Sequence, residues 1–264
     1  MNRKLITTAL ALLLIAGAAW LEMRKAGNKD AQPRPAEQSA ATPAKPQPAP
    51  APSAPSPNQG SASPTRPATT QVPKGSGFDF YVLSLSWSPT FCESGDARDN
   101  DQQCAVGRGR GFVVHGLWPQ NDNGYPEFCP SSEPERVPAS IGRDLGDIMP
   151  SMGLIGHEWR KHGTCSGLSQ RDYFTALAAA FKRVTMPARF ADGRRSQNES
   201  PAGIERAFIE ANPGLSANAV AVTCDGPRLE EVRICMTTSL DFRPCPDVDR
   251  RACRVNSLTL PAAR

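Results

Sequence analysis

The sequence predicts a single α+β domain that is stabilised by disulfide bonds and preceded by two segments of different composition. Segments rich in β-branched and aromatic residues stand on both sides of a middle part with helical periodicity, the pattern of an α+β fold. All eight cysteines lie between residues 92 and 253. An even number of cysteines in an exported chain indicates a disulfide framework. The stretch from 77 to 264 is long enough for one domain with a substantial core.

The first 25 residues have the composition of an export segment. A charged start is followed by an apolar run at 5–21, a length that suits either a long signal peptide or a short membrane anchor. The small residues at 16–18 offer a cleavage site, whereas Arg24 and Lys25 after the run favour an uncleaved anchor. Residues 1–25 are therefore expected to be a signal peptide or a signal anchor, and both alternatives stay open.

Residues 26–76 are rich in proline and alanine and are expected to form a disordered linker. Such a segment cannot bury enough apolar surface to offset the entropy lost on ordering, so it stays extended and partly polyproline II. A spacer is the simplest interpretation, and a proline-rich ligand for another protein is the alternative. The folded domain is expected at 77–264.

The elements of this domain are predicted from periodicity and from turn residues. The strand expected at 111–114 should deliver His115 at its end, because Pro119 and the polar cluster at 121–124 indicate a loop. Gly163 stops the helix expected at 156–162, and Ser200 is the expected N-cap of the helix expected at 201–211. In chain order, we expect strands at 78–87 and 111–114, helices at 141–149, 156–162, 172–184 and 201–211, and adjacent antiparallel strands at 219–224 and 229–236.

The charge of the expected domain argues against a broad basic surface for nucleic acid. The whole chain has a formal net charge of +4, but residues 77–264 hold 21 Lys and Arg against 23 Asp and Glu. Proteins that depend on bulk attraction to phosphates have basic domains. If this domain binds a polyanion, the slightly acidic balance favours a localised cleft.

All three histidines of the chain fall in two short motifs, HGLWPQ at 115–120 and HEWRKHGTC at 157–165. Histidine is the side chain that normally changes charge between about pH 5 and 8. Lys161, inside the second motif, is one of only two lysines beyond residue 76. Histidines combined with Glu158 and Lys161 suit acid–base chemistry on a phosphodiester.

Helical geometry in the second motif argues against a zinc protease. If 157–162 is helical, Glu158 and His162 share one face, and His157 and Lys161 share another. The HExxH zinc motif needs histidines four residues apart, but the fourth position here is Lys161, which repels a cation. No CxxC pair occurs either, so no metal and no cofactor are expected.

Both motifs resemble the two catalytic segments of the ribonuclease T2 family, HGLWP and HEWxKHGxC. The strand segment that ends in Trp87, Pro89 and Cys92 is similar to the first strand of that family, and the stretch 124–129 also matches. The resemblance covers roughly 77–255. One departure is Gln120, where family members commonly carry Asp or Asn, which leaves the base preference open.

The resemblance implies a central antiparallel sheet flanked by helices and an endoribonuclease that cuts single-stranded RNA without a metal. His162 is then the general base and His115 the general acid, with the roles reversed when the cyclic phosphate is hydrolysed. The other implied roles are stabilisation of the phosphorane by Glu158 and Lys161, phosphate binding by His157, and base binding by Trp118, Gln120 and Tyr125. The implied disulfides are Cys92–Cys104, Cys129–Cys165, Cys224–Cys253 and Cys235–Cys245.

The expected partner is single-stranded RNA, and the expected state is a monomer that is exported, most simply to a bacterial periplasm. The apolar run at 5–21 allows tethering to the inner membrane as an alternative to release. Two other functions stay open: an inactive RNA-binding scaffold that kept the fold, and a structural envelope protein whose function is the tether.

Overall fold

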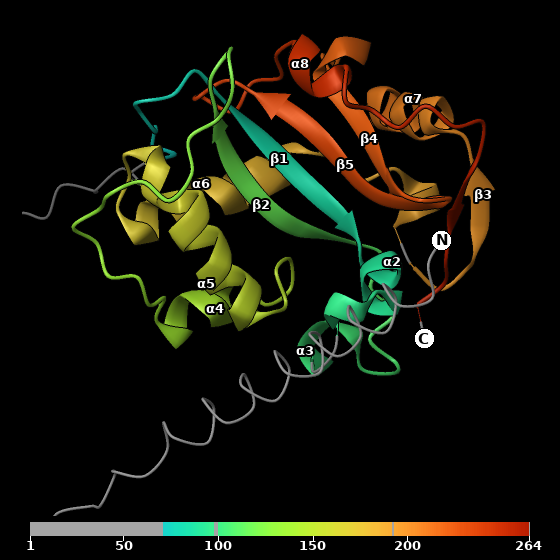
Figure 1. Ribbon diagram of the computed structural model, residues 1–264, viewed down its shortest axis with the longest axis horizontal. Coiled ribbons are helices and arrows are strands. Elements are labelled where there is room, and N and C mark those ends of the chain that lie inside the picture. The colour runs from blue at the N-terminus through green and yellow to red at the C-terminus, as the bar shows by residue number, and fades with distance from the viewer. Residues whose placement is uncertain (1–70, 98–99, 192, 264) are drawn as a thin grey trace, which may run out of the picture. The chain divides into compact units, whose positions relative to one another are not determined.

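The computed structural model describes residues 71–97, 100–191 and 193–263. The expected export segment, and the expected linker up to residue 70, lie outside the described residues. Within the described part, a β-sheet is surrounded by helices (Figure 1), so the predicted α+β class is confirmed. No helix in these ranges has both the length and the apolar character needed to cross a membrane.

The elements of the described part are numbered along the chain. The strands are β1 (Phe80–Trp87), β2 (Phe112–Gln120), β3 (Gln197–Glu199), β4 (Val220–Asp225), β5 (Arg228–Met236) and β6 (Leu258–Leu260). The α-helices are α2 (Ser88–Glu93), α3 (Asp101–Cys104), α4 (Ala139–Leu145), α5 (Met152–Lys161), α6 (Gln170–Arg183), α7 (Pro201–Ala211) and α8 (Pro246–Asp249). Short 3₁₀ helices are η1 (Gly95–Ala97), η2 (Gly163–Ser166), η3 (Ala188–Phe190) and η4 (Ala217–Ala219).

The sheet is built around β1 and β5, which pair with each other in antiparallel fashion. Strand β2 flanks β1, and β4 flanks β5, also antiparallel, as expected for the two adjacent strands near 219–236. The central antiparallel sheet is thus confirmed. It has one parallel connection that no sequence pattern indicated: Arg228 of β5 pairs with Thr259 of β6, and β6 pairs with β3.

Strand β2 runs through His115 to Gln120, so the prediction that the strand ends before His115 was wrong. In the register with β1, Ser84 pairs with Gly116 and Leu85 pairs with Val114, which leaves His115 as the extra residue of a β-bulge. A bulge redirects the side chains of its strand. The strand therefore continues beyond the bulge while His115 is presented on the face away from the core.

Pro119 does not end the strand either, and the loop begins after Gln120. Strand β2 lies at one end of the strand order and pairs only with β1. Proline lacks a backbone N–H, which an edge strand tolerates because one of its sides needs no donor. The loop expected from Pro119 therefore starts two residues after it, at Asn121.

The helices agree with the sequence best where a cap is visible. Helix α7 has the predicted bounds, and the Ser200 side chain accepts a hydrogen bond of 3.0 Å from the Gly203 backbone N–H. Helix α5 begins four residues earlier than predicted, because the Ser151 side chain caps it by accepting from the Leu154 N–H. Helix α4 ends at Leu145, before the predicted end at 149.

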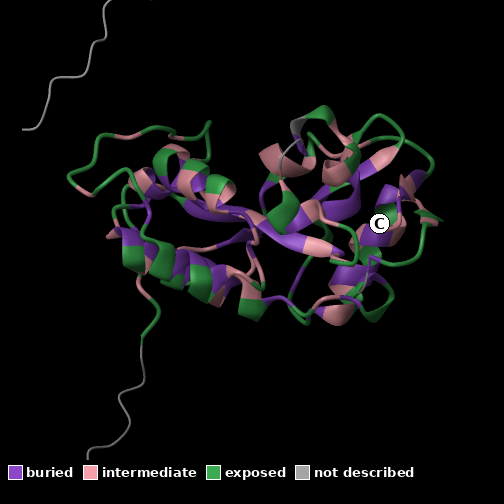
Figure 2. Ribbon diagram, turned by 90° about the horizontal axis from the view of Figure 1, so that it is seen from below, coloured by how far each residue is buried: buried purple, intermediate pink, exposed green. Residues whose placement is uncertain are grey.

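The main core lies between one face of the sheet and the helices, where Figure 2 shows buried residues on both. Tyr173 of α6 is fully buried, and its hydroxyl donates a hydrogen bond of 3.0 Å to the Leu117 carbonyl of β2. Trp159 of α5 is also fully buried, and its indole N–H donates to the Pro134 carbonyl. The Tyr173 bond fixes α6 to β2, and the Trp159 bond fixes α5 to the loop before α4. A bond from Trp118 of β2 to Glu158 of α5 then holds the second histidine motif beside the first.

Four disulfides join all eight cysteines, in the pairs that the family resemblance implies. They are Cys92–Cys104, Cys129–Cys165, Cys224–Cys253 and Cys235–Cys245. The second bridge joins the loop after β2 to η2, directly after α5. It therefore connects the two segments that carry the histidines.

Candidate active site

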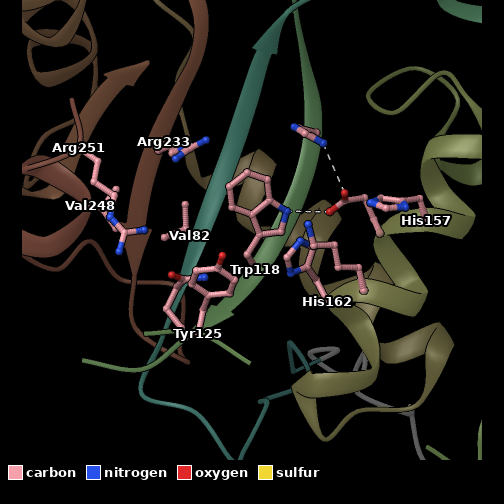
Figure 3. A pocket seen from close by; sticks show the side chains of 12 residues that line it. Val82, Trp118, Tyr125, His157, His162, Arg233, Val248 and Arg251 are labelled. Atoms are coloured by element: carbon pink, nitrogen blue, oxygen red, sulfur yellow. Dashed lines mark hydrogen bonds and ion pairs between the residues drawn. The ribbon is translucent and has the colours of Figure 1, made fainter. Parts of the chain in front are cut away.

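One cleft gathers the eight side chains that the sequence singled out. It has a volume of about 350 Å³, and its walls come from β1, β2, α5, β5 and the region of α8. Figure 3 shows the Trp118 indole between Arg233 on one side and His157 and His162 on the other. The expected residues in the cleft are His115, Trp118, Gln120, Tyr125, His157, Glu158, Lys161 and His162.

His115 stands between two carboxylates. Its Nδ1 donates a hydrogen bond to Glu231 Oε1, and its Nε2 lies 3.5 Å from Glu158 Oε1. Burial alone lowers the pKa of His115, but the hydrogen bond and charge of Glu231, with the charge of Glu158, outweigh it and raise the pKa above 6.5. His115 is therefore held as an imidazolium up to at least mildly acidic pH.

Glu158 is almost fully buried and has a fixed partner in Trp118. The Trp118 indole N–H donates a hydrogen bond of 2.7 Å to Glu158 Oε2. Burial raises the pKa of Glu158 to about 7, against the lowering by the charge of His115 and by the Trp118 bond. The carboxyl group therefore changes its charge near neutral pH: when ionised it raises the pKa of His115, and when neutral it can itself donate a hydrogen bond.

His162 is buried and lies just after α5, where its backbone N–H still donates to the Glu158 carbonyl. Burial lowers the pKa of His162 to about 3, assisted by the positive charges of Lys161, His115 and His157. Its Nδ1 has no hydrogen-bond partner among the described residues. Above about pH 3, His162 is thus a neutral imidazole, and at mildly acidic pH it is neutral while His115 is charged.

His157 and Lys161 stand at the open side of the cleft. His157 is exposed, and its pKa is lowered by partial burial and by the charges of Lys161, His115 and Arg160. Lys161 Nζ lies 3.7 Å from Glu127 Oε2 in an ion pair that is partly exposed on both sides. Exposed ion pairs of this kind contribute little to stability, so Lys161 can exchange Glu127 for another anion.

The three residues expected to bind a base differ in how far contacts within the protein already hold their side chains. Tyr125 is 49% exposed. Gln120 uses its amide N–H to bond the Pro119 carbonyl. Trp118 is committed through its N–H to Glu158, and the Arg233 guanidinium lies over its ring, 5.2 Å from the centroid. Trp118 is therefore part of the carboxylate site as well as an aromatic surface.

Sequence reasoning missed the side of the cleft formed by β5 and the region of α8. Glu231 contacts His115 directly, and Arg233, Val248 and Arg251 line the cleft with Val82 of β1. The available signal was the alternation in β5, where Glu231 and Arg233 are separated by a buried Val232. That alternation predicts a polar face of the strand, but it does not reveal which residue of β2 packs against it.

No cluster of three or more His, Cys, Asp or Glu side chains that could hold a metal ion occurs in the described ranges. The cleft instead combines one charged and one neutral imidazole with a buried carboxyl group and a lysine. Two imidazoles in opposite protonation states can accept a proton on one side of a substrate and donate one on the other.

Comparison with known proteins gives consistent matches. A model of the Ribonuclease T2 family matches residues 78–245. A ribonuclease of Aeromonas hydrophila is 41% identical over 124 residues, which cover 47% of this chain and 54% of that protein. A probable ribonuclease of Haemophilus influenzae is 37% identical over 121 residues, covering 41% and 44%. The chain thus spans about half the length of these two relatives.

A solved structure has the same fold. RNase NT, in a crystal structure with 5′-AMP, superposes with a TM-score of 0.55 at 25% identity, covering 71% of this chain and 100% of that chain. The family match spans more than half of the sequence and includes both histidine motifs. The chain belongs to the ribonuclease T2 family.

Proposed function

We propose that this protein is a metal-independent endoribonuclease that cleaves single-stranded RNA. The product of the first step is a 2′,3′-cyclic phosphate, which is then hydrolysed to a 3′-phosphate. One observation carries the proposal: His115 and His162 line the same cleft, and their surroundings shift their pKa values in opposite directions. Such a divergence divides the acid role from the base role.

In the first step, neutral His162 removes the proton from the ribose 2′-hydroxyl. The 2′-oxygen attacks the adjacent phosphorus, the bond from phosphorus to the 5′-oxygen breaks, and protonated His115 gives its proton to that leaving oxygen. RNA supplies the nucleophile itself, so the reaction needs no metal ion. DNA lacks the 2′-hydroxyl and is not a substrate.

In the second step the two histidines exchange roles, because each now carries the other protonation state. His115 removes a proton from water, and the water oxygen attacks the phosphorus of the cyclic phosphate. The bond from phosphorus to the 2′-oxygen breaks, and His162 gives its proton to that leaving oxygen, which restores the starting state of both rings. The two steps together consume one water molecule.

The remaining residues of the motif act on the phosphoryl group. Lys161 places a positive charge where negative charge grows in the transition state. Neutral Glu158 donates a hydrogen bond to a phosphoryl oxygen, and His157 binds the phosphate at the open side of the cleft. Trp118, Gln120 and Tyr125 contact an unstacked base, which explains a preference for single strands. The nucleotide in the RNase NT structure supports nucleotide binding in this family.

The proposal is tested by incubating the full chain with a single-stranded RNA in the presence of EDTA. We expect cleavage to continue, products with 2′,3′-cyclic phosphate ends by mass spectrometry, and no cutting of DNA of the same sequence. His115→Ala and His162→Ala should each lower kcat/KM by about 10²–10⁴-fold. RNA binding without cleavage would favour the inactive scaffold, and neither binding nor cleavage would favour a structural tether.

We also propose that the enzyme acts as a monomer outside the cytoplasm, most simply in a bacterial periplasm. The apolar run at 5–21 and the eight-cysteine framework support this, because disulfides persist in oxidising compartments. Export also keeps the activity away from the RNA of the cell. Cell fractionation tests it: activity in the cytosolic fraction with free thiols contradicts export, and release from membranes only by detergent favours an uncleaved anchor.

A further inference from the structure

We propose that Glu231 is a positioning residue that holds the His115 ring in one orientation and keeps it protonated. The positive charge of Arg233 opposes this effect of Glu231. This inference rests on the proposed function, because it concerns how the general acid is prepared. Glu231 lies outside both histidine motifs, on β5 instead of β2 or α5. It acts through His115 and is therefore not itself a catalytic residue.

The geometry fixes Glu231 behind the histidine. In the sheet register Glu231 is the direct partner of Ser86 on β1, and only 4% of its side chain is exposed. Oε1 accepts hydrogen bonds from His115 Nδ1 and, at 3.4 Å, from Ser86 Oγ. Oε2 accepts from Arg233 Nε at 2.9 Å and Nη2 at 2.8 Å. Both oxygens are occupied, so the carboxylate has little freedom to rotate.

The β-bulge explains why His115 reaches this carboxylate. As the extra residue of β2, His115 is displaced from the regular register, in which Gly116 pairs with Ser84 and Val114 pairs with Leu85. With Nδ1 bound to Glu231, the imidazole directs Nε2 toward Glu158 and the cleft. A fixed Nδ1 partner selects the ring nitrogen that is left to transfer the proton.

Charges surround His115 on two sides. The cleft side holds Arg233, Arg251, Glu158, His157, Lys161 and His162. A second hollow that His115 also borders holds Asp225, Glu230 and Glu231. Of these carboxylates, Glu231 forms a hydrogen bond to the ring, whereas Glu158 lies 3.5 Å from Nε2 in an ion pair. Arg233 is the cation that is hydrogen-bonded to Glu231.

The pKa values agree with this arrangement. Burial raises the pKa of Glu231, but its bond to His115 and the charges of His115 and Arg233 lower it to about 2, so Glu231 stays an anion. Its hydrogen bond and charge raise the pKa of His115, and the charge of Arg233 lowers it. The two β5 residues thus have opposite effects on the same imidazole.

The experiment measures the His115 pKa directly by NMR on the full chain with ¹³C-labelled histidine. The chain has only three histidines, so the signals are assigned with His115→Ala and His157→Ala. Glu231→Gln should lower the His115 pKa by about 1–3 units, the effect of an opposite charge at contact distance. Arg233→Gln should raise it, and Glu231→Asp, which keeps the charge, should stay closer to the unchanged protein than Glu231→Gln does.

Glu230→Gln is the matched control. Glu230 is the exposed neighbour on the same strand and borders the same hollow, so the substitution removes an equal charge without removing a bond to His115. It should move the His115 pKa far less than Glu231→Gln. If Glu231→Gln does not fold, the other two variants still test the inference. The His115 pKa should rise in Arg233→Gln and should stay close to that of the unchanged protein in Glu231→Asp.

Activity adds a second readout that a merely structural role does not move. In Glu231→Gln the basic limb of the kcat/KM profile should shift to lower pH by the same amount as the His115 pKa. An unchanged His115 pKa in Glu231→Gln, or a fall in Arg233→Gln, overturns the inference. Failure of the proposed function looks different: RNA stays uncut by the unchanged protein while the NMR shifts still appear.

Discussion

The Trp118 indole N–H and the Glu158 carboxylate form a hydrogen bond of 2.7 Å that joins β2 to α5 across the cleft. The bond passes over Gly116. A Cβ atom at Gly116 would overlap Glu158 Oε2 and the Trp118 indole nitrogen, so no larger residue fits there without moving both partners. The glycine of the first motif is therefore explained by close approach of two side chains. Its backbone angles are not the reason, since Gly116 is not among the residues with positive φ.

Gly116→Ala should lower activity strongly with a smaller effect on stability. The added methyl group displaces Glu158 and Trp118, and a misplacement of about 1 Å in a catalytic group can lower the rate about 10²-fold. The measurement is kcat/KM on RNA together with the thermal midpoint. Gly124→Ala is the control for activity, because a Cβ there meets nothing within 4 Å, although its φ of +87° adds local strain. Full activity in Gly116→Ala would contradict the assigned contact.

Trp118→Phe separates the two roles of Trp118. Phenylalanine keeps an aromatic face for a base but loses the N–H, which leaves the buried Glu158 oxygen without its donor. If the bond to Glu158 matters most, kcat should fall about tenfold with little change in KM. A rise in KM at constant kcat would instead make Trp118 mainly a base platform. Steady-state kinetics on a dinucleotide substrate distinguish the two outcomes.

The pH profile follows from the two histidines. His162 must be neutral to act as base, so activity is retained down to its pKa of about 3. His115 must be protonated to act as acid, so kcat/KM falls as pH rises through its raised pKa, above 6.5. We expect a broad acidic optimum, measured from pH 3 to 9.

Glu158→Gln mimics the neutral carboxyl group and should lower kcat/KM less than either histidine substitution does. A large loss of activity would mean that the ionised form of Glu158 is required.

Only some of the contacts in the site could be predicted from the sequence. The His157–His162 segment was predictable, because its residues act from one helix and its end, at fixed spacing. The pairing of His115 with Glu231 was not, since the residues are 116 positions apart and meet through the β1 register and a bulge. A bulge leaves no periodic signal, because it is the place where the period of two is broken.

In the fold, too, features set by neighbouring residues in the sequence were predictable, and features set by distant pairing were not. Helix α7 was predicted with the observed bounds because Ser200 and Pro201 mark its start locally. Strand β2 was predicted too short, because the tolerance for Pro119 depends on its being an edge strand, which is a property of the whole sheet. Local caps can be read from the sequence, but the neighbours of a strand cannot.

Lys161→Ala should depress turnover more than substrate affinity. Among the described residues, the Lys161 side chain pairs with Glu127 in a partly exposed ion pair, and its charge is needed most where charge grows on the phosphoryl group. We expect kcat to fall by about 10–100-fold, below the loss of about 10²–10³ for a rigid donor in a closed site. Lys182→Ala on α6 is the matched control, as the other lysine beyond residue 76 and exposed. If only KM rises, Lys161 is a binding residue.

Removal of the Cys129–Cys165 bridge should weaken both the fold and the cleft. The bridge closes a loop of 36 residues, and chain-entropy arguments assign about 4 kcal/mol to such a constraint. It also holds the segment of Tyr125 and Glu127 against Lys161, whose carbonyl accepts a hydrogen bond from the Phe128 N–H at 2.8 Å. The double Cys→Ser variant should therefore lower the midpoint of denaturation and raise KM at a temperature where it is still folded.

The matched control is the double Cys→Ser variant of the Cys92–Cys104 bridge. This bridge closes a loop of 12 residues away from the cleft, so its removal should lower stability by about 3 kcal/mol without changing KM. Equal KM values in the two variants would mean that the Cys129–Cys165 bridge stabilises the domain without shaping the substrate site.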